Sequence, residues 1–307
     1  MASKYTVQGI HGQDGRISMS NKILLEMKNI TKSFPGVRAL DGVSLSVKAG
    51  TVHALMGENG AGKSTLMKCL FGVYEKDSGQ ILLDGKEVNF KNSRDALEGG
   101  VAMVHQELNQ AMRRSVSDNM WLGRYPRIAP WLPIVDERRA RHLTDKIFER
   151  LSISVNPKAK VQDLSVSVRQ MLEIAKAISY GAGVIVFDEP TAGLDPAGRD
   201  LVLSKIKEYR DLTDAIVFIV SHSMEDMAKT ADRLLVMNGG DLFMLDKPDN
   251  VFKHSRVLEE IGLSVPQITR VFCRLHDSGI AVPDDVYTVE SALNAILPLL
   301  KGGRLNG

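Results

Sequence analysis

The chain has 307 residues, of which 44% are hydrophobic and 25% charged, so it can bury one large core or two modest ones. Its 39 basic and 37 acidic residues give a net charge of +2, and no overall electrostatic field therefore favours nucleic acid as a partner. The cysteines are Cys69 and Cys273, which exclude a disulfide scaffold and fit a reducing compartment in which both are buried thiols.

No apolar run reaches the length of a bilayer span, and the N-terminus lacks the basic and apolar regions of an export signal. We therefore expect a chain that neither crosses a membrane nor is exported by a signal of its own. Residues 1–21 show no hydrophobic period, so we expect a flexible tail that carries no chemistry.

Residues 22–107 have the pattern of the first part of an α/β core. Short β-prone runs are separated by turns, and they predict strands at residues 23–27, 43–47 and 51–56. Residues 63–71 are predicted to form a helix, and residues 79–88 a hairpin.

The strand pattern fades between residues 108 and 175. Residues 138–151 have the period of a helix, with arginines opposite an apolar face of Leu143, Ile147 and Leu151. We therefore expect residues 108–175 to form a helical subdomain inserted into the core.

Strand patterns return after residue 176, at residues 184–187, 215–220 and 233–237. A predicted helix at residues 196–209 separates the first two of these strands. Strands that alternate with helices are typical of a parallel sheet, so residues 176–250 are predicted to complete the α/β core. The pattern of residues 251–303 is helical, with breaks at Pro266 and Pro283, and predicts a small C-terminal extension.

A glycine-rich motif, GENGAGKST, lies between the predicted strand at residues 51–56 and the helix that follows. It satisfies the pattern G-x-x-x-x-G-K-[ST], in which backbone N–H groups turn inward around phosphate and the helix N-terminus adds positive potential. Lys63 would neutralise terminal phosphates, and Ser64 would ligate Mg²⁺. An ordinary glycine-rich turn is the alternative, but spacing and context favour a nucleotide. The predicted nucleotide-binding residues of the motif are Gly57, Asn59, Gly60, Ala61, Gly62, Lys63, Ser64 and Thr65.

The apolar run VIVF at residues 184–187 ends in two adjacent acids, Asp188 and Glu189. Burying two carboxylates is costly unless a cation meets them. A magnesium nucleotide beside the strand end would give Asp188 a cation to coordinate. Glu189, on a different side, would orient and deprotonate the attacking water. An acidic pair that caps the next helix is the alternative.

At these motifs the chain resembles the ATPases of ABC transporters, and the resemblance covers roughly residues 23–250. It implies a P-loop NTPase cassette with a RecA-like α/β core, an N-terminal antiparallel β part and a helical subdomain. ATP and Mg²⁺ are the implied cofactors, and ATP hydrolysis is the implied reaction.

The resemblance also implies roles for four residues outside the two motifs. Gln106 in VHQE would touch Mg²⁺ and report the nucleotide state to membrane subunits, and His222 in VSHS would contact the γ-phosphate. Asp195 in AGLDP would lie at the seam of a dimer, and Phe34 in KSFPGV would stack on adenine. Taken singly, Gln106, His222 and Phe34 have simpler explanations: a glutamine after a strand, a satisfied histidine and a core phenylalanine.

The family signature, usually LSGGQ, is LSVSV in this chain, at residues 164–168. Ser165 remains, and with backbone N–H groups at a helix start it can grip a γ-phosphate. Both glycines are replaced, as sugar-importer ATPases of the ribose and galactoside type tolerate, but Val168 departs even from their pattern. We expect this signature to be the weakest part of the site.

In the family that the chain resembles, the signature serine of one cassette faces the phosphate-binding motif of another. The chain is therefore expected to act in a homodimer or heterodimer that ATP closes and hydrolysis opens. Membrane permease subunits are the other implied partners, and nucleic acid is not one. The implied location is peripheral, at the cytoplasmic face of the cell membrane.

Two parts of the chain resemble different transporters. Residues 23–190 resemble the first cassette of galactose or methyl-galactoside importers in SGQILLDGKEVNF and MVHQELN, whereas residues 191–303 resemble energy-coupling factor ATPases in TAGLDPAGRD. A chimera with a join near residue 190, natural or engineered, is one interpretation. Sugar uptake is the favoured function. The alternatives are uptake of vitamins or metal ions, an engineered nucleotide-binding protein with weak activity, and a soluble ABC-type ATPase of DNA repair or translation.

The same resemblance predicts two contact surfaces. Residues 107–165 would contact the permease, through a groove for its coupling helix formed by Trp121, Leu122, Tyr125 and Trp131; packing within the subdomain is the alternative. The helices after Val251 would dimerise the ATPases or, alternatively, cap the sheet.

Overall fold

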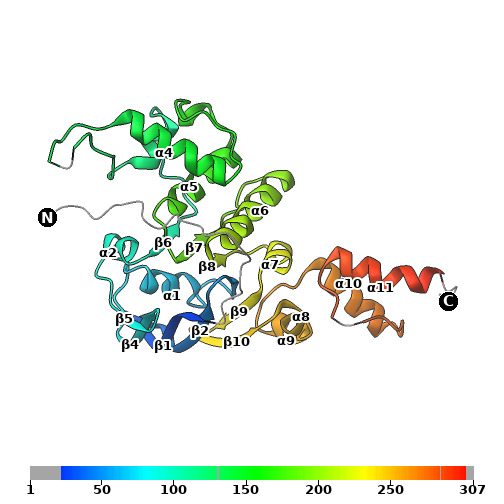
Figure 1. Cartoon of the computed structure of the whole chain (residues 1–307). Helices are drawn as coiled ribbons and strands as arrows, with labels where there is room; N and C mark the ends of the chain where they lie inside the picture. The colour runs from blue at the N-terminus through cyan, green and yellow to red at the C-terminus, as the bar shows by residue number, and fades with distance from the viewer. Residues whose placement is uncertain (1–21, 130, 284, 302–307) are drawn as a thin grey trace.

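The computed structural model describes residues 22–129, 131–283 and 285–301. The predicted flexible tail, residues 1–21, lies outside the described residues, as do residues 302–303 of the predicted extension. Figure 1 shows β-sheets at the base, a helical part above them and a row of C-terminal helices at one side.

The first sheet is antiparallel, with strand order β2-β1-β4-β5. Its strands are β1 (Ile23–Phe34), β2 (Val37–Lys48), β4 (Ser78–Leu83) and β5 (Lys86–Val88). The strands β1 and β2 are longer than the runs predicted at residues 23–27 and 43–47. Their pairing shifts register between Met27 and Ile30, where Asn29 has a φ of 51°. Such a shift interrupts the alternation of side chains, so alternation alone predicts shorter strands.

The second sheet has the strand order β10-β9-β3-β8-β7-β6, and β10 alone is antiparallel to its neighbour. The predicted α/β core with a parallel sheet is confirmed. The edge strand β10 was not predicted, because residues 242–245 form a short continuous apolar run that shows no alternation in the sequence. The strands are β3 (Val52–Met56), β6 (Val101–Val104), β7 (Val184–Asp188), β8 (Ile216–Val220), β9 (Arg233–Asn238) and β10 (Asp241–Asp246).

Alternate residues of the parallel strands face different helices. Val184 and Val186 of β7 pack with the antiparallel sheet and with α1 (Lys63–Leu70), and α2 (Ser93–Glu98) adds Ala96 to this face. Ile185 and Phe187 pack with α5 (Val166–Ile178) and α6 (Pro196–Thr213). Since side chains of a strand alternate between its faces, α1 and α5 lie on opposite faces of the sheet. The short helix α7 (Met224–Thr230) follows β8 and packs against β3 and β9.

The helical part consists of α3 (Val116–Trp121), α4 (Glu137–Arg150) and α5, with a short 3₁₀ turn at Val161–Asp163. These helices enclose a core of their own, separate from the sheet. The limit that we predicted for this part, residue 175, falls inside α5, which continues to Ile178.

Trp121 belongs to the core of the helical part and not to a surface groove. It is 6% exposed, and its Nε1 donates a hydrogen bond of 2.9 Å to Oγ1 of Thr144. Its predicted place in a groove is therefore wrong, and the alternative of packing within the subdomain describes it. Leu122 and Trp131 are exposed, by 54% and 81%.

Four helices follow the last strand: α8 (Pro248–Phe252), α9 (Ser255–Glu260), α10 (Gln267–Asp277) and α11 (Val289–Lys301). The predicted breaks at Pro266 and Pro283 both fall between helices. Phe252 and Leu258 pack on β3 and β9, so α8 and α9 cap the sheet. In contrast, α10 and α11 share a small core around Phe272.

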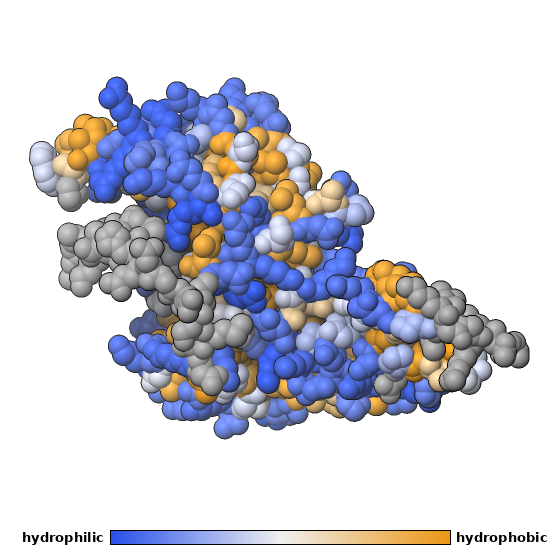
Figure 2. Space-filling view, turned by 45° about the vertical axis from the view of Figure 1, so that its right-hand side comes forward, coloured by the Kyte–Doolittle hydropathy of each residue, from blue (hydrophilic) through white to orange (hydrophobic). Residues whose placement is uncertain are grey.

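The C-terminal helices also carry apolar surface, visible at the right of Figure 2. Its residues on α11 are Val289, Leu293 and Leu297, which are spaced by four and exposed. Among the described residues, no helix combines the length and the apolar character that crossing a bilayer requires.

Candidate active site

Most of the predicted site residues lie just beyond the carboxyl ends of the parallel strands. Leu55 of β3 pairs with Val220 of β8, and Val220 pairs in turn with Asp188 of β7. On the other side of β7, Phe187 pairs with Val104 of β6. Parallel strands end at a common edge, where open α/β sheets bind their ligands. The pairing therefore brings together residues from distant parts of the chain: the motif at 57–65, Gln106, Asp188, Glu189 and His222.

Residues 57–65, which we call the phosphate loop, depend on glycine at two positions. Gly57 has a φ of 155° and Gly62 a φ of 99°. A Cβ at Gly57 would lie 2.6 Å from the carbonyl oxygen of Met237, and a Cβ at Gly62 would lie 2.6 Å from that of Ala39. Because backbone atoms cannot move aside cheaply, only glycine lets the loop approach β9 and β2 this closely.

Lys63 begins α1, and its side chain folds back over the phosphate loop. Its Nζ donates hydrogen bonds to the carbonyl oxygens of Gly57, at 2.6 Å, and of Glu58, at 3.0 Å. Burial lowers the pKa of Lys63, while the carboxylates of Glu189 and Asp188 act in the opposite direction. The ammonium group thus lies within electrostatic reach of both acids.

No side chain of the described residues caps the N-terminus of α1. Its first backbone N–H groups therefore have the partial positive charge of a helix start, without a capping oxygen to neutralise it. Ser64 is exposed and Thr65 half-exposed at this end of the helix. An anionic group placed over the loop would meet these N–H groups and the Lys63 ammonium together.

Glu189 has a strained backbone and a largely buried carboxylate. Its φ is 49°, in the left-handed region that residues other than glycine seldom adopt. Its N–H donates a hydrogen bond to the carbonyl oxygen of Val220. Oε2 accepts a hydrogen bond of 3.2 Å from Ser221 Oγ, and Oε1 lies 3.6 Å from His222 Nε2. Oε1 is buried and has no hydrogen-bond partner in the described structure.

Burial is the main cause of a raised pKa at Glu189, and the Asp188 carboxylate adds to it. The neighbouring His222 and Ser221 oppose this shift by favouring the charged form. Sequence reasoning did not single out Ser221. A hydroxyl residue directly after a buried parallel strand is the signal that was available for it.

Gln106 and Phe34 are less closely tied to this group. Gln106 is exposed, two residues beyond Val104 at the end of β6. Phe34 ends β1, and its half-buried ring meets the edge of Tyr74, with centroids 5.2 Å apart. The ammonium of Lys32 lies 5.6 Å from the Phe34 centroid. The described ring contacts of Phe34 are thus with Tyr74 and Lys32 and not with the phosphate loop.

Ser165 and Asp195 are helix caps on the other face of the sheet. Ser165 Oγ accepts from the N–H of Val168, at 3.4 Å, and so caps α5. Asp195 Oδ1 accepts from the N–H of Gly198, at 3.0 Å, and caps α6. A Cβ at Gly198 would lie 3.4 Å from the Cβ of Ser167, so the two helix starts are adjacent. The structure therefore brings Ser165 and Asp195 near each other, while the sheet separates α5 from α1.

Comparison with known proteins agrees with this arrangement. Residues 40–192, from β2 to just past Glu189, match the protein family described as ABC transporter. The chain contains an ABC transporter ATPase domain.

Comparison with curated relatives shows which ABC transporter proteins the domain is similar to. The chain is 55% identical over 219 residues to the galactose/methyl galactoside import ATP-binding protein MglA of Fusobacterium nucleatum, covering 71% of this chain and 43% of that protein. It is 50% identical over 248 residues to MglA of Salmonella typhimurium, covering 81% and 48%. The chain thus spans less than half the length of these relatives. The second alignment covers 248 residues and so cannot lie within the first 190, which means that the likeness to MglA continues past residue 190.

Solved structures share the fold of the ABC ATPase domain. A nucleotide-free ATP-binding cassette from an ABC transporter superposes with a TM-score of 0.66 at 27% identity, covering 74% of this chain and 92% of that chain. CbiO1 from Clostridium perfringens, part of the ABC transporter complex cbiONQ, superposes with a TM-score of 0.66 at 26% identity, covering 80% and 97%. The predicted cassette fold is therefore confirmed. The chimera near residue 190 stays a prediction.

The residues of this ABC ATPase domain fit a nucleotide with its metal ion. The uncapped start of α1 and the Lys63 ammonium suit a triphosphate, and the unpartnered Glu189 Oε1 suits a group that can donate a hydrogen bond, such as a water. No cluster of three or more His, Cys, Asp or Glu side chains that could hold a metal occurs among the described residues. A magnesium ion here would rely on Asp188, Ser64 and phosphate oxygens, which is how Mg²⁺ is usually bound beside nucleotides.

Proposed function

We propose that this chain is the ATP-binding and ATP-hydrolysing part of an ABC importer that takes up a sugar of the galactoside class. The observation that carries the hydrolysis is the Glu189 carboxylate at the edge that the phosphate loop shares. Its Oε1 is buried 3.6 Å from His222 Nε2 and has no hydrogen-bond partner among the described residues. The identity of 50 to 55% with galactose/methyl galactoside import proteins supports the sugar.

In the proposed reaction, the N–H groups at the start of α1 and the Lys63 ammonium bind the β- and γ-phosphates. Mg²⁺, held by Ser64 and Asp188 with Gln106 nearby, would neutralise charge on the phosphates. Glu189 would orient the attacking water and accept its proton, while His222 would donate a hydrogen bond to the γ-phosphate. A raised pKa suits this role, because it makes the carboxylate a better proton acceptor.

A second cassette is the proposed partner in this reaction. Ser165 caps α5 on the face of the sheet opposite α1, so the chain does not present Ser165 to its own phosphate loop. A homodimer or heterodimer would supply Ser165 and Asp195 from one chain to the nucleotide held by the other. Closing and opening of such a dimer would convert hydrolysis into motion.

Permease subunits are the second proposed partner, and they would hold the chain at the cytoplasmic face of the membrane. Several large apolar side chains are exposed in the segment between α3 and α4, a composition that marks contact surfaces. They are Leu122, Ile128, Trp131, Ile134 and Val135.

Replacing Glu189 with Gln tests the proposed hydrolysis, because the amide keeps the size of the side chain and cannot accept the proton. We expect phosphate release to fall about 100-fold or more, and ATP to hold the variant as a dimer that size-exclusion chromatography detects. The control is Glu260→Gln, which makes the same change at an exposed position of α9. Phosphate release by Glu189→Gln at the wild-type rate would show that the assignment of Glu189 is wrong.

An energy-coupling factor ATPase is the second candidate. It is supported by the superposition with CbiO1, which covers 80% of this chain and 97% of CbiO1. The two candidates differ in their membrane partners. Affinity capture of the chain from detergent-solubilised membranes, followed by mass spectrometry, would find a sugar permease in the first case and a transmembrane coupling subunit in the second.

A further inference from the structure

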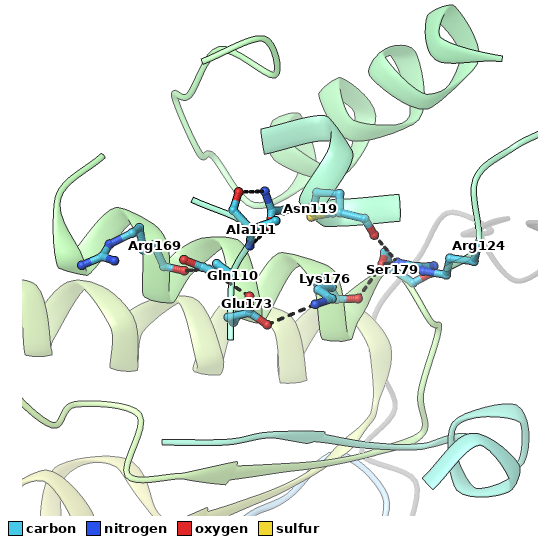
Figure 3. A network of polar contacts seen from close by, with 9 residues as sticks. Gln110, Ala111, Asn119, Arg124, Arg169, Glu173, Lys176 and Ser179 are labelled. Atoms are coloured by element: carbon cyan, nitrogen blue, oxygen red, sulfur yellow. Dashed lines mark hydrogen bonds and ion pairs between the residues drawn. The ribbon is translucent and has the colours of Figure 1, made fainter. Parts of the chain in front are cut away.

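The segment that follows β6 passes Gln106 and reaches the helical part at Gln110. At this end it is held by contacts with α3 and α5 (Figure 3). Gln110 Nε2 donates hydrogen bonds of 2.9 Å both to the carbonyl oxygen of Arg169 and to Oε1 of Glu173. Arg169 and Glu173 lie in the first turns of α5. Gln110 therefore binds the helix close to Ser165, its N-cap.

The neighbouring residue, Ala111, is fixed by a different helix. Asn119 of α3 is buried, its Oδ1 accepts from the N–H of Ala111 at 2.8 Å, and its Nδ2 donates to the Ala111 carbonyl oxygen at 3.2 Å. Figure 3 shows Asn119 on one side of the loop at Gln110 and Ala111, and α5 on the other side. The backbone at Gln110 is thus held in place, and a shift of the segment would be passed to α5.

The chemistry of the Gln110 contacts permits one orientation of its amide. Both partners are acceptors, a carbonyl oxygen and a carboxylate oxygen, so only the NH₂ group can face them. Gln110 Oε1 and Arg169 Nε are buried without hydrogen-bond partners in the described structure. The junction is therefore not fully satisfied, which leaves room for a second arrangement of it.

We propose that Gln110 is a positioning residue that couples the segment after β6, which contains Gln106, to the start of α5, and so sets how Ser165 is presented to the nucleotide of the second cassette. The inference rests on the proposed function. It gives Gln110 no contact with ATP, so its effect is on turnover and on dimer closure and not on binding of nucleotide to the phosphate loop.

The decisive variant is Gln110→Glu, which places a carboxylate against the Arg169 carbonyl and the Glu173 carboxylate. At saturating Mg-ATP we expect kcat to fall about tenfold, with the Kd for a fluorescent ATP analogue unchanged within about twofold. Gln110→Ala, which removes the donor without adding charge, should lower kcat by a smaller factor. The matched control is Gln162→Glu, the same change at an exposed position of the helical part.

Rescue separates positioning from general damage to the fold. Gln110→Glu combined with Glu173→Gln reverses donor and acceptor, so a bond between residues 110 and 173 can form again. We expect this double variant to recover part of the lost kcat, to clearly above that of Gln110→Glu alone, because the carboxylate at position 110 still faces the Arg169 carbonyl. ATP-dependent dimerisation in the Glu189→Gln background, followed by light scattering, should be weakened by Gln110→Glu and restored in the same way.

Two failures can be told apart. If the wild type neither hydrolyses ATP nor dimerises with it, the proposed function is wrong and the role of Gln110 falls with it. If the wild type does both and Gln110→Glu matches it, or if the double variant is no better than Gln110→Glu alone, only the coupling role is overturned.

Discussion

The side chain of Glu58, in the phosphate loop, lies directly against Gly262, in the turn between α9 and α10. A Cβ at Gly262 would overlap the Glu58 carboxylate, and Gly262 has a φ of +80°. Leu263, the next residue, is buried in the same cluster as Met56, the last residue of β3. The C-terminal helices therefore contact both the phosphate loop and the strand that leads into it.

Gly262→Ala should destabilise the chain more than Gly279→Ala. Gly279 has nearly the same backbone, with a φ of +83°, and no atom of the described residues lies within 4 Å of an added Cβ, so it reports the backbone strain alone. Because the Glu58 carboxylate is the exposed end of a flexible side chain and can move aside, we expect an additional loss of only about 0.5 kcal/mol in the free energy of unfolding for Gly262→Ala, measured by urea titration. Glu58→Ala should remove this additional loss in a double-mutant cycle. Equal losses for the two alanine variants would contradict the contact.

The two tryptophans should differ strongly in what they contribute to stability. Trp121→Phe leaves the Thr144 hydroxyl without its 2.9 Å donor inside a closed core, and we expect a loss of about 1 to 3 kcal/mol. Trp131→Phe, at a side chain 81% exposed, should stay within about 0.5 kcal/mol of the wild type. Urea unfolding monitored by circular dichroism compares them. Similar losses would mean that Trp121 is not packed as described.

Lys63→Ala should weaken ATP binding far more than Lys68→Ala. Both lysines lie on α1, but the Lys63 ammonium crosses the phosphate loop, whereas that of Lys68 lies 5.4 Å from the ring centroid of Tyr74. Losing a charged hydrogen-bond donor to phosphate should raise the Kd about 10- to 100-fold. Equilibrium titration with a fluorescent ATP analogue measures both variants. A Kd that Lys63→Ala leaves unchanged would exclude the phosphate loop as the binding site.

His53 should make the folded state sensitive to acid. It is almost fully buried in β3, and its Nδ1 has no hydrogen-bond partner among the residues that the structure describes. Burial lowers its pKa from 6.5 to about 4, against the opposing charge of Asp232. The unfolded chain therefore takes up the proton first. Above pH 6.5 both states are neutral at this residue, and stability is lost as the pH falls from about 6.5 towards 4, by about 3 kcal/mol in total.

The variant His53→Gln cannot take up this proton. Its free energy of unfolding, from urea titrations between pH 7 and pH 4.5, should fall less steeply than that of the wild type. Parallel curves for the two proteins would show that His53 does not titrate as described.

The phosphate loop and the acidic pair were predictable because each motif follows a buried strand. Glycine spacing and a run of aliphatic residues are local properties, and the parallel order of β3, β8 and β7 then places Lys63 and Glu189 at one edge. The position of Trp121 was not predictable in this way. An aromatic residue at the end of a short helix looks the same in sequence whether it faces a groove or a core. Its burial depends on Thr144, 23 residues away.

The contacts of Gln110 and Gly262 could not be predicted from the local sequence either. Gln110 meets Glu173 across 63 residues, and Gly262 meets Glu58 across a still longer stretch of chain. Neither position has an unusual neighbourhood in sequence. Long-range pairs such as these follow from topology, which hydrophobic periodicity does not encode.

The order of the parallel strands has a consequence for how the chain is made. The strand β3 lies between β8 and β9, which begin at Ile216 and Arg233, and the Val52 N–H finds its acceptor on Asp232. A growing chain on the ribosome has therefore synthesised the phosphate-loop strand long before either neighbour exists. Both edges of β3 stay open until then, which favours slow folding and protection of the nascent chain by chaperones. A fragment cut at residues 40–192 would keep β3 but lose both of its neighbours.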